Sequence, residues 1–105
     1  MVAPDRGDLV LITIERPDGV AQRTPALVVS PQRYNGKSGL ALMCAIAPRA
    51  KGYPFEVALP EGLAVSGVIL ADHLRSADWK ARSATIMGRA PAEVVEDVLA
   101  KLKPL

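Results

Sequence analysis

The sequence has little of what most enzyme sites are built from. It contains one cysteine and one histidine in 105 residues, so neither an internal disulfide nor a zinc site made of several soft ligands can form. It also lacks a glycine-rich phosphate-binding loop, which excludes the common nucleotide-cofactor enzymes. We therefore expect no metal ion and no other cofactor.

Long hydrophobic runs are absent as well. No stretch of about 18 consecutive apolar residues occurs, and the N-terminus has no apolar leader, which predicts neither secretion nor a membrane span. A single thiol is typical of proteins in reducing compartments, so the expected location is the cytoplasm. The length fits one domain covering residues 1–105.

The two reactive side chains that do occur, Cys44 and His73, are formally able to make a nucleophile pair. Cys44 lies among aliphatic residues, whereas a reactive thiolate needs an accessible, electropositive setting, so the sequence favours an inert core thiol. His73 follows Asp72 at the end of an apolar run, which is more typical of a hydrogen-bonding structural residue than of a general base. Trp79 is expected to be a packing anchor rather than a base-stacking platform.

The net charge of +2 does not by itself indicate a nucleic-acid-binding protein, so the placement of the cations matters more than their sum. Cations expected in loops are Arg16, Arg23, Arg33, Lys37, Arg49, Lys51, Arg75, Lys80 and Arg82. If the strands form one compact sheet, the loops that carry Arg23 and Arg49 would lie together and form a phosphate-binding face. The alternative is an ordinary surface of solvated charges.

Short apolar runs predict a fold rich in β-strands. The expected strands cover residues 9–14, 26–30, 40–46, 53–57, 67–71 and 84–88, and the segment 72–76 is expected to be a polar edge. Pro25 and Pro31 are expected to bound the second strand, because proline cannot donate to a β-ladder. Asn35-Gly36 predicts a turn within a loop over residues 33–39.

The last part of the chain predicts a helix. Pro91 suits its first position and Glu93 its first turn. The apolar residues that share one helical face are Val94, Val95, Val98, Leu99 and Leu102. Short strands followed by one helix predict a mainly β, α+β fold, with a small, strongly bent sheet or barrel and a packed C-terminal helix.

The stretch from residue 44 to residue 57 holds a candidate site. An apolar strand ends there, a basic turn presents Arg49 and Lys51, and the aromatic residues Tyr53 and Phe55 follow. Cations hold backbone phosphates and aromatic rings stack on unpaired bases, so this combination suits single-stranded nucleic acid. The alternative from spacing alone is a hairpin with a solvated turn.

Five segments form an ordered pattern along nearly the whole chain. They are residues 6–10 (RGDLV), 25–31 (PALVVSP, followed by Tyr34-Asn35), 51–57 (KGYPFEV), 67–76 (GVILADHLRS) and 78–82 (DWKAR). Together they resemble the MazF/PemK family of toxin endoribonucleases. The resemblance implies an SH3-like barrel with added helices, of the type shared by MazF, PemK and CcdB, and a homodimer. It also implies a cognate antitoxin with a segment that lies across the RNA groove.

Family members cut single-stranded RNA at short sequences without a metal ion. The ribose 2'-hydroxyl attacks the adjacent phosphorus and leaves a cyclic phosphate and a 5'-hydroxyl, so the protein must orient the chain and stabilise a dianionic phosphorane. The family's cation is an Arg directly before the Pro-Ala of the second strand, and its hydroxyl is a Thr or Ser shortly before Lys-Gly-Tyr-Pro. In this sequence the first position holds Thr24, and the second falls on Ala47 or Pro48.

The resemblance therefore predicts an altered catalytic pair, in which Arg23 supplies charge and Thr24 supplies the hydroxyl. It also makes the stretch 44–57 one wall of an RNA groove shared between subunits. The residues expected to bind RNA are Arg49, Lys51, Tyr53, Phe55, Glu56 and Arg82.

Three functions are open at this stage. The first is an active endoribonuclease toxin of a type II toxin-antitoxin system. The second is a family member that has lost cleavage and binds RNA or an antitoxin. The third is a gyrase-directed toxin of the same fold, although residues 101–105 show no ending typical of that group.

Overall fold

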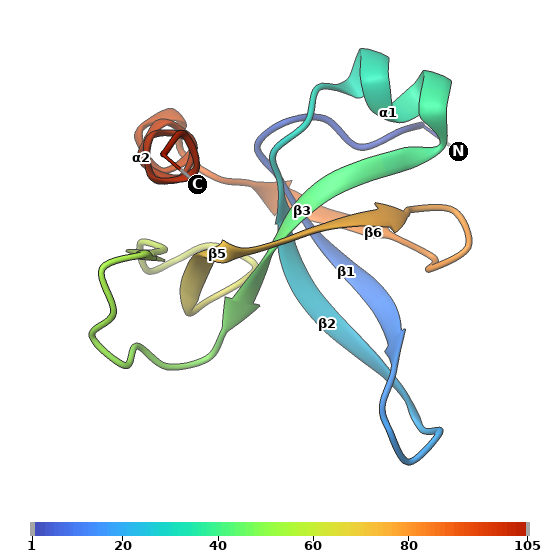
Figure 1. Cartoon of the computed structure of the whole chain (residues 1–105), viewed down its shortest axis with the longest axis horizontal. Helices are drawn as coiled ribbons and strands as arrows, with labels where there is room; N and C mark the ends of the chain where they lie inside the picture. The colour runs from blue at the N-terminus through green and yellow to red at the C-terminus, as the bar shows by residue number, and fades with distance from the viewer. Residues whose placement is uncertain (1, 105) are drawn as a thin grey trace.

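The computed structural model describes residues 2–104 as an antiparallel sheet with two helices (Figure 1). The elements are β1 (Asp8–Glu15), β2 (Ala21–Val28), α1 (Gln32–Ser38), β3 (Leu40–Ala47), β4 (Glu56–Ala58), β5 (Val68–Asp78), β6 (Thr85–Arg89) and α2 (Ala92–Leu102). The strand order across the sheet is β4-β5-β3-β2-β1-β6. The α+β class and the C-terminal helix are therefore confirmed. No helix within residues 2–104 is long and apolar enough to cross a membrane.

Strands β1 and β2 form a long hairpin whose tip projects away from the rest of the sheet (Figure 1). The prediction that Pro25 bounds the second strand is wrong, because β2 continues through it. Thr13 donates its backbone N–H to Arg82, on the side of β1 away from β2, so Thr13 and its partner Arg23 on β2 form a pair without hydrogen bonds to each other. Every second residue of β2 behaves in the same way, so the backbone nitrogen of Pro25, like that of Arg23, points away from β1. Pro25 therefore faces the other edge of β2, where β3 pairs only with Ala26–Val28 and no ladder bond is lost.

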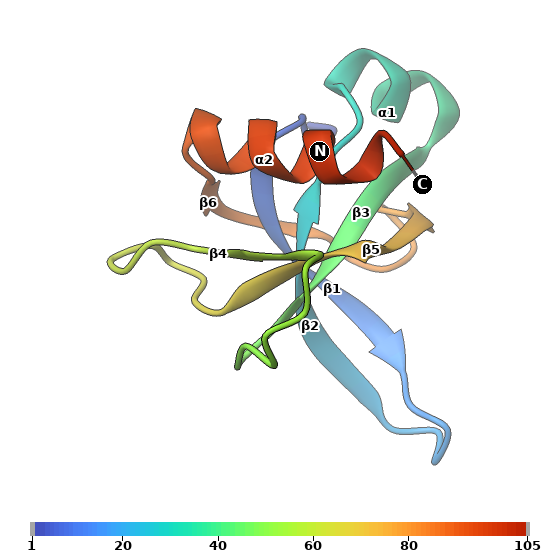
Figure 2. The ribbon, with the colours of Figure 1, turned by 60° about the vertical axis from the view of Figure 1, so that its left-hand side comes forward.

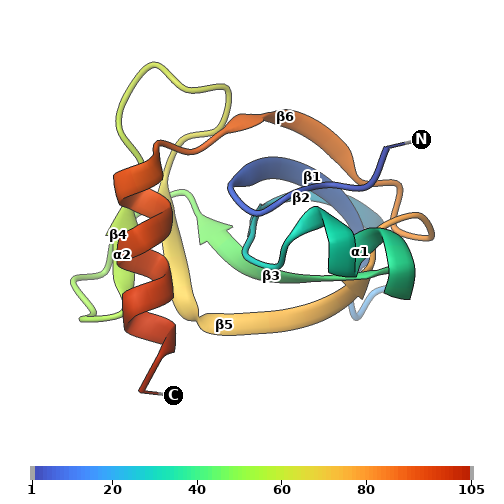
Figure 3. The same cartoon turned by 90° about the horizontal axis from the view of Figure 1, so that it is seen from above.

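Strand β5 is longer than the sequence suggested. It runs through the segment 72–76, which was expected to be a polar edge, and the strand expected from Tyr53 begins only at Glu56. The pairing of β5 with β3 is interrupted, because Ala45 alone on β3 faces residues 70–73 on β5. A surplus of residues on one strand forms a bulge and bends it. Figure 3 shows the resulting corner in β5, beside α2.

Two apolar clusters occupy opposite faces of β2, because successive side chains of a strand alternate between its faces. Leu27 enters the first cluster, which is closed by Val95 and Val98 of α2. Helix α2 lies across β4 and β5 (Figure 2), with which it makes its main contacts. The neighbouring residues Ala26 and Val28 enter the second cluster. Burying each large aliphatic side chain stabilises the fold by roughly 1.5–3 kcal/mol.

The loop predicted over residues 33–39 is wrong, because α1 occupies it. Asn35 is fully buried, and its Nδ2 donates to the carbonyls of Pro4 at 2.8 Å and Ser30 at 2.9 Å. Trp79 donates from Nε1 to the backbone carbonyl of Asn35 at 2.9 Å, so its role as a packing anchor is confirmed. These distant partners outweigh the local turn preference of Asn35-Gly36. The helix ends instead at Gly39, whose φ is 76°.

Candidate functional site

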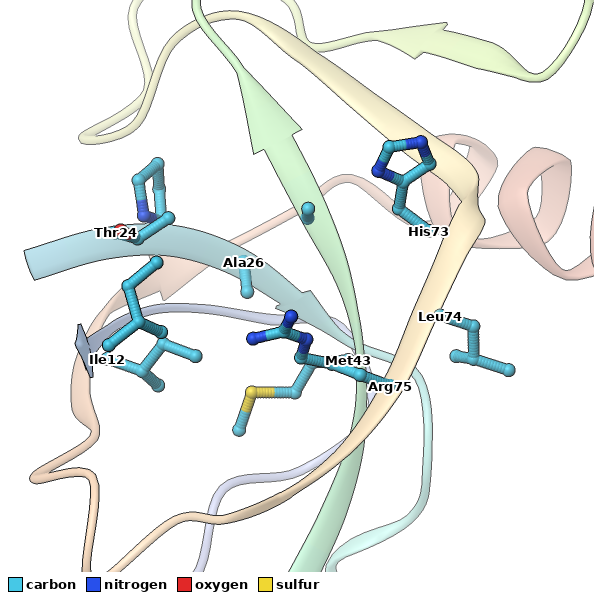
Figure 4. Close-up of a pocket in the computed structure, with 10 residues that line it drawn as sticks. Ile12, Thr24, Ala26, Met43, His73, Leu74 and Arg75 are labelled. Carbon is cyan, nitrogen blue, oxygen red and sulfur yellow. The ribbon is translucent and has the colours of Figure 1, made fainter. Parts of the chain in front are cut away.

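Two adjoining cavities lie along β5, and His73 lines both. The strand pocket has a volume of about 320 Å³ and lies over β2 and β3 (Figure 4). Its polar or charged lining residues are Thr24, His73 and Arg75. The loop pocket has a volume of about 200 Å³ and lies between β5 and the loop that follows β3. Its lining residues are Ala47, Arg49, Lys51, Tyr53, Glu56, Leu70, Asp72 and His73.

The strand pocket has an apolar floor and a cation above it. Figure 4 shows the Arg75 side chain extending from β5 toward Met43, with Thr24 and His73 on opposite sides of the cavity. The Arg75 side chain makes no hydrogen bond or ion pair with any residue in the range 2–104. The hydroxyl of Thr24 is buried and has no hydrogen-bond partner within the same range. An unpaired guanidinium is a group that a bound phosphate would satisfy.

The loop pocket owes its shape to Glu56, at the start of β4. One carboxylate oxygen accepts the backbone N–H groups of Lys51 at 3.1 Å and Gly52 at 3.0 Å, and the other accepts that of Lys51 at 3.0 Å. Gly52 has a φ of 84°, a conformation that suits glycine in a tight turn. The tightened loop presents the basic side chains of Arg49 and Lys51 at the pocket wall.

The bulge in β5 explains why His73 reaches both cavities. Residues 70–73 lack regular partners on β3, so this part of the strand does not follow the usual alternation of faces. Asp72 and His73, although consecutive, both line the loop pocket. The side chain of His73 is exposed and makes no hydrogen bond within the described residues. The interpretation of His73 as a hydrogen-bonding structural residue is therefore wrong.

Four of the predicted RNA-binding residues lie together in the loop pocket: Arg49, Lys51, Tyr53 and Glu56. Phe55 instead packs against the first apolar cluster. Arg82 lies elsewhere, next to the β1 strand, where its Nη1 donates to the carbonyl of Thr13 at 3.3 Å.

The two residues of the predicted catalytic pair occupy opposite faces of β2. Thr24 shares its face with Ala26 and lines the strand pocket. The Arg23 guanidinium crosses β1, donating to the Oγ1 atoms of Thr13 at 2.9 Å and Thr85 at 2.7 Å. It also donates to the carbonyl of Ser83 at 2.7 Å. Arg23 thus ties the β5–β6 loop to the hairpin, and neither pocket includes it among its lining residues.

Cys44 does not take part in the site. Its side chain is fully buried, and burial, together with the charge of Asp72, raises the pKa of the thiol to about 11. The thiol therefore stays protonated at neutral pH and lies 3.7 Å from the carbonyl oxygen of Ala71. The interpretation of Cys44 as an inert core residue is confirmed.

Comparison with known proteins shows the family of the chain. Residues 5–105 match the family described as the PemK-like, MazF-like toxin of type II toxin-antitoxin systems. The chain belongs to this toxin family. It is 40% identical to the endoribonuclease toxin MazF of Escherichia coli K12 over 104 residues, covering 97% of this chain and 93% of that protein. It is 36% identical to the endoribonuclease toxin ChpB of the same organism, covering 94% and 90% of the two chains.

The fold of this PemK/MazF-like chain also matches solved structures of the family. The MazE-MazF structure (Form-II) from Deinococcus radiodurans superposes with a TM-score of 0.92 at 50% identity, covering 97% of this chain and 94% of that one. The MazF structure (Form-I) from the same organism gives a TM-score of 0.87 at 49% identity, with the same coverage of both chains.

The positions that the sequence resemblance assigned to the family's catalytic pair lie at different pockets. Thr24 lines the strand pocket and Ala47, one of the two residues expected at the second position, lines the loop pocket, whereas Pro48 lines neither. The sequence did not place His73 or Arg75 among the residues expected to bind or cut RNA. The sequence did contain a signal for them. In the run Asp72-His73-Leu74-Arg75, three polar residues follow a buried apolar strand, and polar and apolar residues do not strictly alternate as they would in a regular half-buried strand.

Proposed function

We propose that this chain is an endoribonuclease toxin of a type II toxin-antitoxin system that cuts single-stranded RNA without a metal ion. The family membership and the names of the endoribonuclease relatives support this function. The observation that carries it is the groove formed by the two adjoining pockets, in which the side chains of Arg49, Lys51 and Arg75 form no ion pair within residues 2–104. Cations left unpaired around a cavity attract a polyanion.

The groove provides the two things that cleavage by the 2'-hydroxyl requires. Tyr53 is 63% exposed and offers a ring on which an unpaired base can stack. Thr24 and Arg75 line a cavity with an apolar floor, where the interaction of the Arg75 guanidinium with phosphorane charge is stronger than in water. Attack of the 2'-oxygen on phosphorus then leaves a cyclic phosphate and a 5'-hydroxyl.

The predicted pair of Arg23 and Thr24 is tested by mutation. Thr24→Val keeps the shape and removes the hydroxyl, so we expect slower cleavage with unchanged folding. Arg23→Ala removes three short hydrogen bonds to Thr13, Ser83 and Thr85, so we expect lower thermal stability and retained cleavage. Loss of cleavage by a folded Arg23→Ala protein would restore Arg23 to the chemistry.

We also propose a homodimer, a cognate antitoxin and a cytoplasmic location. The structures named MazE-MazF from Deinococcus radiodurans support a protein partner for this fold. Exposed apolar side chains on β5 and β6 offer surface for association, since Leu74 is 44% exposed and Ile86 45%. Sedimentation of the purified chain tests the homodimer. Rescue of growth by a co-expressed neighbouring gene product tests the antitoxin.

A digest of mixed single-stranded RNA, followed by analysis of the product ends, tests the function itself. Cyclic phosphate and 5'-hydroxyl ends, formed in the presence of a metal chelator, are the expected result. RNA binding without cutting would show a binding module instead. Inhibited DNA supercoiling with intact RNA would show a gyrase-directed toxin.

A further inference from the structure

His73 occupies the junction of the site. It is the single histidine of the chain, and it lines both the strand pocket and the loop pocket. Figure 4 shows its imidazole at the bend of β5, across the cavity from Thr24. The ring is exposed and has no hydrogen-bond partner within residues 2–104, so both ring nitrogens are free to meet a ligand.

The other groups around the junction are poor proton acceptors. Cys44 is buried and protonated, and Ala47 has no functional group. Glu56 already accepts three backbone hydrogen bonds that hold the loop in place. Arginine and lysine side chains are protonated at neutral pH, and an aspartate such as Asp72 is a weak base there. Imidazole is the side chain whose basicity matches proton transfer near neutral pH.

We infer that His73 is the proton-transfer residue of RNA cleavage in this chain, a role that rests on the proposed endoribonuclease function. Neutral His73 takes the proton of the ribose 2'-hydroxyl as the bond between the 2'-oxygen and phosphorus forms. The bond between phosphorus and the 5'-oxygen breaks, and the 5'-oxygen takes a proton from water. The hydroxide left by that water is neutralised by the imidazolium, so protons and charge balance.

Charged groups surround His73 on several elements of the fold. On its own strand it has Asp72 and Arg75 as charged neighbours. Across the loop pocket it faces Arg49, Lys51, Tyr53 and Glu56. Arg49, Lys51 and Arg75 are placed to hold the phosphate of the scissile bond beside the ring.

The test separates cleavage from binding. His73→Gln should cut mixed single-stranded RNA at least about 100-fold more slowly than the unchanged protein, the usual range for loss of general acid-base catalysis. Its affinity for a 2'-O-methyl RNA, which cannot be cut, should change less than threefold. Ser76→Ala, an exposed position on the same strand outside both pockets, is the matched control and should match the unchanged protein in both assays.

The pH dependence gives a second readout that a structural role would not move. Because the chain has one histidine, proton NMR of untagged protein follows the titration of this ring alone. The cleavage rate should fall as pH drops through that same titration midpoint, and His73→Ala should regain activity when imidazole is added. A folded His73→Gln protein that cuts within threefold of the unchanged protein overturns the inference, and so does parallel loss of RNA affinity. Failure of the unchanged protein to cut any RNA overturns the proposed function instead.

Discussion

The salt dependence of RNA binding is a direct consequence of the charges in the groove. Arg49, Lys51 and Arg75 line the two pockets, and their side chains form no ion pair in the described part of the chain. Each cation that contacts a single-stranded phosphate contributes about −0.7 to the slope of log affinity against log salt. Three contacts give a slope of about −2, so raising salt from about 50 to about 200 mM should weaken binding roughly 18-fold.

Removing one cation should change this slope by a known amount. Arg75→Gln leaves two contacts, so the slope should become less steep, at about −1.4, and the same salt change should weaken binding only about sevenfold. Lys80→Gln is the control, because Lys80 lies outside both pockets with its Nζ 5.5 Å from the centre of the Trp79 ring. Its slope should equal that of the unchanged protein.

Fluorescence anisotropy with a labelled 2'-O-methyl RNA of mixed sequence measures the affinity without cleavage. The titration is repeated at four or more salt concentrations for the three proteins. An affinity that does not change between low and high salt would refute the groove as an RNA site. If Arg75→Gln and Lys80→Gln make the slope less steep by the same amount, RNA binding is spread over the surface rather than held in the two pockets.

Two further predictions concern the structure that supports the groove. Gly67→Ala should lower the free energy of unfolding by about 3 kcal/mol or more, measured by thermal or urea denaturation. The reason is that Gly67 has a φ of 123° and that an added Cβ would clash with the Ala47 carbonyl oxygen. Stability equal to that of Gly19→Ala, whose added Cβ would meet open space, would contradict this prediction. Cys44 should not react with a thiol reagent at pH 8 in the folded protein, because a thiol pKa of about 11 leaves about one molecule in a thousand as thiolate. The same thiol should react at once after the protein is unfolded in urea. Fast reaction of the folded protein would refute the burial of Cys44.

Local sequence patterns located most of the secondary structure. The aliphatic run at residues 9–14 and the helical spacing after Pro91 appear as β1 and α2, since both signals arise from one buried face of a single element. The failures have a common cause. Asn35-Gly36 favours a turn, but hydrogen bonds from Asn35 to Pro4 and Ser30 hold a helix there, and no local pattern records such distant partners.

The basic turn was predictable for the same reason that β1 was. Arg49, Lys51 and Tyr53 lie within five residues of one another, so any loop there presents them together, and the loop pocket includes all three. Phe55, two residues further on, was expected in the groove and packs into the core instead. The direction of a side chain at the end of a turn depends on what the turn packs against.

The sequence by itself determined the family, the α+β class and the basic turn, because each depends on residues that are close in the chain or on ordered motifs. The tertiary structure alone decided which groups meet. Pairing of β5 with β3 leaves residues 70–73 in a bulge, and that bulge brings His73 to the junction of the two pockets. The pairing of β1 with β2 and β6 turned Arg23 toward Thr85 and away from the site. Strand register is set by the packing of the whole sheet, so one-residue differences in it lie beyond what local sequence patterns specify.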